Sequence, residues 1–205
     1  MRVLVTAFGP FPGVPVNPTQ AAVTELGRRA AGSALPGIDL ATAVLPVDFA
    51  VVPELVAHLI DQHHPDVVLC TGVSAKATAI TVERVAVNLV DARVPDATGA
   101  QPVDLPVVVG APDGLLATIP VKAVRAAIRD AGVPAELSLS AGTYGCNAAM
   151  FAALHHAPEG ARAGFLHIPP AEVMDADRVA DALVAAVLAC ARHETDLHVP
   201  AGELA

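Results

Sequence analysis

The sequence predicts an α/β protein, a single-domain three-layer α/β/α sandwich around a mostly parallel, mixed sheet. Short runs rich in β-branched residues alternate with longer amphipathic segments along the chain. The length of 205 residues suits one ordinary domain. Since no internal repeat or linker interrupts the pattern, we expect one domain over residues 1–205, with residues 196–205 as a loose tail.

The first half of the chain supplies strands and helices in alternation. Asn17 and Pro18 mark a helix start, because asparagine suits the N-cap and proline the first helical position. Residues 66–71 are nearly all apolar, as expected for a strand that is covered on both faces. The predicted strands here are 2–7, 40–47, 66–71 and 79–89, and the predicted helices are 17–31 and 50–63.

The second half begins with a long segment, 91–118, that is rich in proline and glycine and has no helical period. Such a long loop in a compact domain is typical of a functional or interface segment. Strands are then expected over 135–140 and 163–168, and helices over 121–131, 143–156 and 171–192. Ligands of α/β folds bind at the carboxyl ends of strands, so the loops after Ala7, Thr71, Ser140 and Ile168 should form the site.

Composition excludes several classes of function. The net charge is −9 and no lysine or arginine cluster exists, which disfavours nucleic-acid binding. No apolar run reaches the roughly 20 residues that a membrane helix needs, and the N-terminus is typical of a first strand rather than a signal peptide. We therefore expect a cytoplasmic protein without membrane partners. Hydrophobic residues make up 54% of the chain, which indicates either a subunit interface or a core rich in alanine and valine.

Three cysteines, at positions 70, 146 and 190, are an odd number without C-x-x-C spacing, so neither a disulfide framework nor a metal site is expected. Cys146 lies in the first turn of a predicted helix, where unpaired N–H groups and the helix dipole favour the thiolate and could receive an oxyanion. The alternative is a small buried apolar residue. Cys70 is expected in the core, and Cys190 either in helix packing or in contact with its own copy.

A nucleophilic cysteine needs a base and an acid that orients it. His167 follows a short apolar run and precedes Ile168, which places it at the carboxyl end of a strand, the edge where we also expect Cys146. Glu83 stands alone in an apolar stretch, and a carboxylate in such surroundings needs a partner. That partner could be His167, and the alternatives are a structural ion pair with Arg93 or with Arg84, although neighbours in an extended strand point to opposite faces.

Four blocks of sequence resemble one known family. They are VLVTAFGPF with VNPT, ITVERVAVNLVDARVPD, SAGTYGCN and GFLHIP, which together extend from residue 3 to residue 169. The chain resembles pyroglutamyl-peptidase I, a family of cysteine peptidases. The resemblance implies that Cys146 is the nucleophile, that His167 is the base and that Glu83 holds the imidazole ring.

The resemblance also implies a substrate pocket. The two aromatic side chains of the first loop, Phe8 and Phe11, would flank a lactam ring, although they could also simply anchor the loop. Asn17 would contact the lactam or serve only as the helix N-cap. Val73 would border the pocket, and Arg93 would lie near the reacting carbonyl.

The implied function is hydrolysis of the amide bond after an N-terminal pyroglutamyl residue through a thioester. The partners would be pyroglutamyl peptides, the enzyme would need no metal or cofactor, and it would form a homo-oligomer, a dimer or a tetramer. One departure stands out: residues 73–77 lack the Gly-Arg pair that the family carries before the glutamate. A non-catalytic binder of lactams or peptides, and a cysteine amidase for another neutral amide, are the alternatives.

Overall fold

In the computed structural model, residues 1–11, 14 and 16–202 are described, and they form eight strands and five helices. The α/β class with a mixed, mostly parallel sheet is confirmed. The strands are β1 (Arg2–Phe8), β2 (Asp39–Leu45), β3 (Val67–Val73), β4 (Ile80–Glu83), β5 (Val85–Val87), β6 (Gly114–Leu116), β7 (Ala135–Ser138) and β8 (Arg162–Ile168). The helices are α1 (Pro18–Ala31), α2 (Val52–His63), α3 (Val121–Asp130), α4 (Gly145–His156) and α5 (Ala176–Arg192).

Six strands form the central sheet in the order β2-β1-β3-β8-β4-β7. Strands β1, β2, β3 and β8 run parallel to one another. Strand β4 is antiparallel to β8, and β7 is parallel to β4, so the last two strands run against the rest. The carboxyl ends of β4 and β7 therefore do not share an edge with those of β1, β3 and β8.

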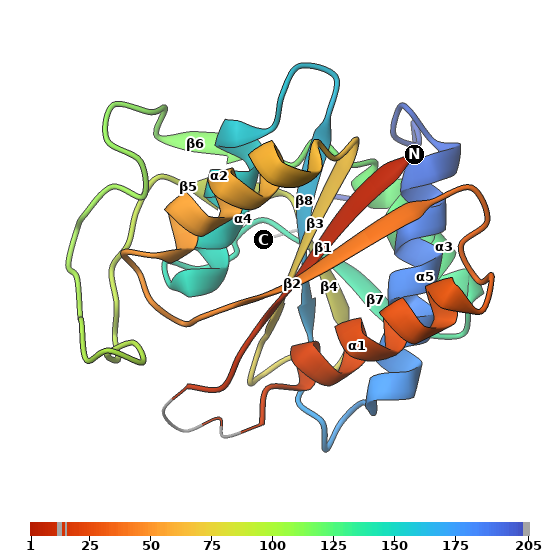
Figure 1. Ribbon diagram of the computed structural model, residues 1–205, viewed down its shortest axis with the longest axis horizontal. Coiled ribbons are helices and arrows are strands. Elements are labelled where there is room, and N and C mark those ends of the chain that lie inside the picture. The colour runs from red at the N-terminus through yellow and green to blue at the C-terminus, as the bar shows by residue number, and fades with distance from the viewer. Residues whose placement is uncertain (12–13, 15, 203–205) are drawn as a thin grey trace.

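Helices cover both faces of this sheet, with α1, α3 and α5 on one side and α2 and α4 on the other (Figure 1). Alternate residues of each strand point to opposite faces. In β1, Val3 and Val5 pack toward α1 and α5, whereas Leu4 packs toward α2 and α4. Strands β1, β3 and β8 are buried on both faces, which explains their continuous apolar runs.

The expected strand over 79–89 is wrong in extent, because the chain leaves the central sheet after Glu83. The backbone N–H of Arg84 still donates to the carbonyl of Ser138 beside it, at 2.8 Å. The carbonyl of Arg84, however, accepts from the N–H of Ala117, and β5 then pairs with β6 in a separate two-stranded sheet. The loop predicted over 91–118 accordingly contains a strand.

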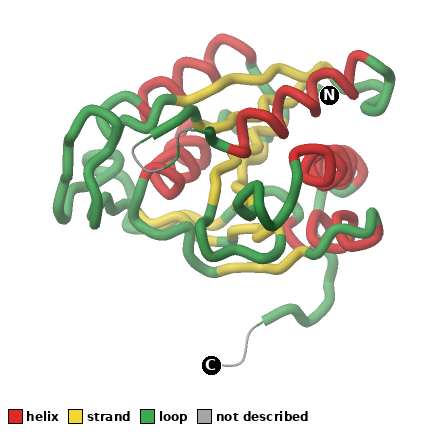
Figure 2. The backbone as a smooth tube through the Cα atoms, turned by 90° about the horizontal axis from the view of Figure 1, so that it is seen from below, coloured by secondary structure: helices red, strands yellow, loops and turns green. Residues whose placement is uncertain are grey.

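The rest of that segment lies on the side of α2 and α4, away from α1, α3 and α5 (Figures 1 and 2). Asp96 is buried and fixes a turn, accepting hydrogen bonds from the N–H groups of Phe49, Thr98 and Ala100 and from the hydroxyl of Thr98. Burial raises the pKa of Asp96, but these donors outweigh it and lower that pKa below its usual range.

The N-cap preferences of the sequence predicted the start of α1 better than the start of α5. Asn17 caps α1 as expected, its side chain accepting from the N–H of Thr19. Helix α5 begins at Ala176 rather than at Ala171, because Asp175 is the N-cap and accepts from the N–H of Arg178.

The segment after α5 is tied to the domain over part of its length. Asp196 accepts from the N–H groups of Lys122 and Ala123 at the start of α3, and Nζ of Lys122 donates to the carbonyl of Val199. Residues 203–205 of the predicted tail lie outside the described residues.

Candidate active site

The site lies on the face of the sheet that carries α4. Along β8, Leu166 and Ile168 point into the core below α1, α3 and α5, so Phe165 and His167 point toward α4. In β4, Ile80 and Val82 point into the same core as Leu166, which leaves Thr81 and Glu83 on the face of His167. The antiparallel register sets Thr81 opposite His167 and Glu83 diagonally across from it.

Glu83 and His167 form a buried pair. Nδ1 of His167 donates to Oε1 of Glu83 at 2.8 Å, and the carboxylate is only 2% exposed. Burial lowers the pKa of His167, but the nearby Cys146 and the bonded Glu83 carboxylate outweigh it and raise that pKa to about 10. Among the described residues, neither Arg84 nor Arg93 forms an ion pair with Glu83. The carboxylate therefore fixes the imidazole ring.

Cys146 reaches this pair by a route that the sequence did not predict. Strand β7 ends at Ser138 and runs opposite to β8, so the expectation that the two strands share a carboxyl edge is wrong, although the loop after Ser140 does line the site as expected. Residues 139–144 bring the chain back, and α4 begins at Gly145 with Tyr144 as N-cap. Cys146 is consequently the second helical residue, partly exposed, and it lines the same cavity as Glu83 and His167.

Gly72 makes the close approach of Cys146 possible, and sequence reasoning did not single it out. It pairs with His167 across β3 and β8, on the face toward α4. A Cβ atom at this position would lie 2.6 Å from Sγ of Cys146 and 2.8 Å from the ring of Phe165. Both distances are shorter than van der Waals contact, so only glycine leaves room for the sulfur beside the histidine.

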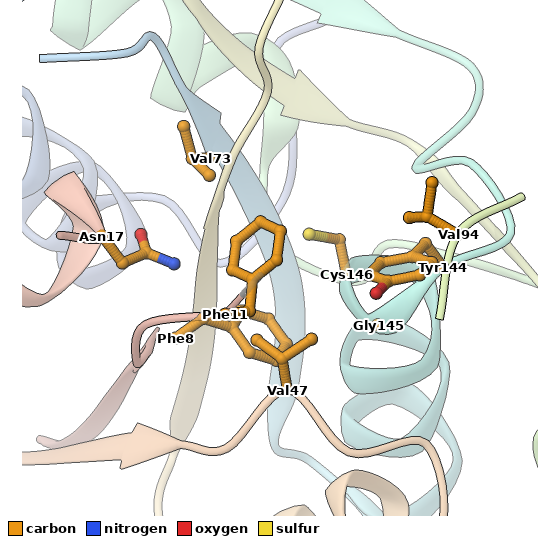
Figure 3. Close-up of a pocket in the computed structure, with 9 residues that line it drawn as sticks. All are labelled: Phe8, Phe11, Asn17, Val47, Val73, Val94, Tyr144, Gly145 and Cys146. Atoms are coloured by element: carbon orange, nitrogen blue, oxygen red, sulfur yellow. The ribbon is translucent and has the colours of Figure 1, made fainter. Parts of the chain in front are cut away.

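A cavity of about 180 Å³ opens on one side of Cys146 (Figure 3). This cavity, which we call the lactam-side cavity after the ring that the family resemblance implies, has mostly apolar walls: Phe8, Phe11, Asn17, Val47, Val73, Val94, Tyr144, Gly145 and Cys146. Figure 3 shows Sγ of Cys146 and the amide of Asn17 pointing toward the ring of Phe11 from opposite sides. Its volume equals that of about six water molecules, which suits a small ring.

Asn17 both caps α1 and lines this cavity. Its Oδ1 accepts from the N–H and hydroxyl of Thr19, and its Nδ2 donates to the carbonyl of Gly9 at 3.1 Å. An amide nitrogen carries two hydrogens, so one donor remains for a ligand. The two roles that the sequence left open are compatible.

A second cavity, of about 470 Å³, lies on the other side of Cys146. This cavity, which we call the amine-side cavity after the leaving group that the resemblance implies, is more polar, and its lining includes Glu83, His167, Lys76 and several residues with hydroxyl groups. Cys146, Tyr144 and Val73 border both cavities, so the sulfur stands at their junction. A bond cleaved at this sulfur would leave one product in each cavity.

Tyr144, the only tyrosine of the chain, connects the site with the long 91–118 segment. Its hydroxyl donates to the carbonyl of Pro95 at 2.9 Å, and its ring meets that of Phe49 edge to face. Burial and the charges of Asp96 and Cys146 raise the pKa of Tyr144. Sequence reasoning gave this residue no role, although its place two positions before the cysteine was a usable signal.

Arg93 is the one predicted site residue that the structure keeps apart from the others. Its side chain is exposed and lines neither cavity, whereas its neighbour Val94 borders the lactam-side cavity.

The two cysteines other than Cys146 are fully buried, and burial raises the pKa of both Cys70 and Cys190 to about 12. Cys190 is enclosed by its own chain, which places its sulfur away from the surface that a second copy could contact.

No group of three metal-binding side chains occurs within residues 1–11, 14 and 16–202. Over the same residues, none of the helices has both the length and the apolar character needed to cross a membrane.

A partly exposed cysteine at a helix start, beside a buried histidine–carboxylate pair on an α/β sheet, is the arrangement of a cysteine-type hydrolase.

Comparison with known proteins agrees with this class. The family model described as pyroglutamyl peptidase matches residues 1–191. The pyrrolidone-carboxylate peptidase of Clavibacter michiganensis subsp. michiganensis is 40% identical over 98% of both chains, and that of Thermococcus kodakarensis is 46% identical over 82% of this chain and 81% of its own. The solved pyrrolidone carboxyl peptidase of Thermococcus litoralis superposes with a TM-score of 0.89 at 33% identity, over 97% of this chain and 99% of its own. The chain belongs to the pyroglutamyl peptidase family, and the prediction of a cysteine-type hydrolase is confirmed.

Replacing Gly72 by alanine should displace the sulfur of Cys146. We expect the rate at which iodoacetamide alkylates Cys146 in the native protein to change by about 10-fold or more, because the new Cβ pushes Sγ away from His167. We also expect the free energy of unfolding to fall by about 1–3 kcal/mol, the usual cost of overpacking. Mass spectrometry of the Cys146 peptide measures the first effect and urea denaturation the second.

Gly27→Ala is the matched control, because a Cβ atom at Gly27 in α1 meets nothing within 4 Å. This variant should keep the alkylation rate and gain up to about 1 kcal/mol of helix stability. An unchanged alkylation rate in Gly72→Ala would show that the close approach has no effect on the thiol.

The raised pKa of His167 makes stability depend on pH. A histidine whose pKa is higher in the folded state stabilises the protein fully below its unfolded value and loses that contribution as the pH rises toward about 10. Glu83→Gln removes the charge that favours the imidazolium. The stability advantage of the wild type over Glu83→Gln should therefore be largest just below pH 6.5, the ordinary pKa of histidine, and shrink toward pH 10 in urea titrations. A constant difference would contradict the assignment.

Proposed function

We propose that the chain hydrolyses the amide bond after an N-terminal pyroglutamyl residue, with Cys146 as nucleophile. The observation that carries this proposal is the buried Glu83–His167 pair, which faces the cavity where Cys146 stands. Membership of the pyroglutamyl peptidase family supports the choice of substrate.

The geometry suggests a division of roles. Nδ1 of His167 is bound to Glu83, so Nε2 is the nitrogen left to exchange a proton with Cys146. Sγ attacks the pyroglutamyl carbonyl carbon, and the imidazolium protonates the leaving amine as the C–N bond breaks. Water then attacks the thioester while His167 takes its proton, which releases pyroglutamate and the free thiol.

The first turn of α4 is the proposed oxyanion site. Helix α4 has no side-chain N-cap, and its first intrahelical bond runs from the N–H of Ala148 to the carbonyl of Tyr144. The N–H groups of the first helical residues, Cys146 among them, therefore have free hydrogen-bonding capacity. Donors fixed in this way can stabilise a charge that develops on the carbonyl oxygen.

The lactam-side cavity is the proposed pocket for the pyroglutamyl ring. A lactam is neutral and has a flat amide, which suits aromatic walls from Phe8 and Phe11, contact with Val73 and the remaining N–H of Asn17. We retain Arg93 as a substrate contact that forms only with the substrate bound, because the adjacent Val94 already borders this cavity.

Cys146→Ala should reduce release of a chromophore from a pyroglutamyl amide by about 10³-fold or more, since the nucleophile is gone. Cys190→Ala is the control, because that thiol is buried and should leave activity within about 2-fold. Full activity of Cys146→Ala would exclude this mechanism.

A panel of amides separates the alternatives. Tight binding of pyroglutamate without turnover by the wild type would indicate a non-catalytic binder of lactams or peptides. Faster cleavage of prolyl or glutaminyl amides than of the pyroglutamyl amide would indicate a cysteine amidase of different specificity.

We further propose one catalytic domain over residues 1–205 that forms a homo-oligomer, a dimer or a tetramer, in the cytoplasm. Support for association comes from apolar side chains that are more than half exposed: Val16, Val94, Val103, Leu105, Val109, Leu116 and Leu139. Three free cysteines suit a reducing compartment. Sedimentation velocity should give a mass two or four times that of the chain, and a monomer at micromolar concentration would refute association.

A further inference from the structure

The amine-side cavity has a feature that pyroglutamyl hydrolysis alone does not require. We propose that Lys76 binds a carboxylate on the leaving part of the substrate, so that the protein prefers pyroglutamyl peptides with a negative charge just after the cleaved bond. This inference rests on the proposed function, because it assigns the second cavity to the leaving amine.

The position of Cys146 determines which part of a substrate faces Lys76. With the pyroglutamyl ring in the lactam-side cavity and its carbonyl at Sγ, the rest of the peptide must leave by the other side of the sulfur. The amine-side cavity is there, and with about 470 Å³ it is more than twice the size of the first. It therefore has room for one or two residues of the leaving peptide.

The amine-side cavity holds one positive charge, that of Lys76, which no neighbouring side chain that the structure describes neutralises. Its charged or titratable side chains, apart from the thiol, are Lys76, Glu83, His167 and Tyr144, and the Tyr144 hydroxyl is bound to the carbonyl of Pro95. Glu83 and His167 are bound to each other, so their charges offset one another. Lys76 is exposed and forms no ion pair with any residue that the structure describes, which leaves one positive charge facing the leaving group.

The remaining polar lining favours an anion as well. Three residues of the lining, Ser74, Thr81 and Ser140, carry hydroxyl groups, and a hydroxyl can donate to a carboxylate without adding charge, whereas the hydroxyl of Ser138 already donates to the carbonyl of Ser140. The carboxylate could be the C-terminus of a pyroglutamyl dipeptide or an acidic side chain in a longer peptide. The net charge of −9 opposes acidic substrates at long range, so any such preference must come from a local cation.

Four substrates distinguish these sources of the carboxylate. Pyroglutamyl-alanine and its C-terminal amide differ only in the terminal charge, whereas pyroglutamyl-glutamate amide and pyroglutamyl-glutamine amide differ only in the side chain. For wild type and Lys76→Met, kcat/KM is measured from the amine released. Lys76→Met should lower kcat/KM for at least one carboxylate substrate by about 3- to 5-fold, mainly through KM, and leave the neutral partner unchanged. Lys76→Glu should enlarge the effect to about 10-fold, and Lys76→Arg should restore the wild-type ratio.

Arg192→Met, at the far end of α5, removes the same charge from a remote exposed position and serves as the control. The proposal is overturned if Lys76→Met changes charged and neutral substrates equally, or if Arg192→Met reproduces the effect. Failure of the proposed function would look different, because the wild type would then cleave none of the four peptides.

Discussion

The hydrogen bond between Nδ1 of His167 and Oε1 of Glu83, 2.8 Å long and almost fully buried, is the interaction on which the rest of the site depends. A buried carboxylate without a partner would be strongly unfavourable, and a buried histidine without one would lose its charge. Each side chain thus makes the burial of the other tolerable. The pair forms because β4 runs antiparallel to β8, which sets Glu83 diagonally across from His167 on the face toward α4.

A second constraint is the space between this pair and α4. Gly72 in β3 lies directly beside His167, and its missing side chain is what admits the sulfur of Cys146. Asn147, the next residue of α4, is fully buried and bonds to the backbone at Val87 and Leu89, so the first turn of the helix is fixed from the other side. Packing on two sides determines where the thiol stands, independently of any substrate.

Local patterns predicted those parts of the molecule that depend on neighbouring residues. The cap at Asn17 and the place of Cys146 in the first turn of a helix follow from rules that act over a few positions. The direction of β7, the split after Glu83 and the close contact at Gly72 depend on which strands become neighbours, and a single sequence does not encode that in its periodicity. The family resemblance led us to expect Arg93 in the site, but it lies on a long loop, where tertiary packing and not the local sequence places the side chain.

We expect Cys146 to carry the acyl group as a thioester during turnover. Acid quenching within milliseconds of mixing the protein with an activated pyroglutamyl ester, followed by peptide mass spectrometry, tests it most directly. The peptide that contains Cys146 should gain the mass of one pyroglutamyl group, and peptides with Cys70 or Cys190 should not. Consumption of the ester without any adduct, or an adduct on another residue, would contradict the claim.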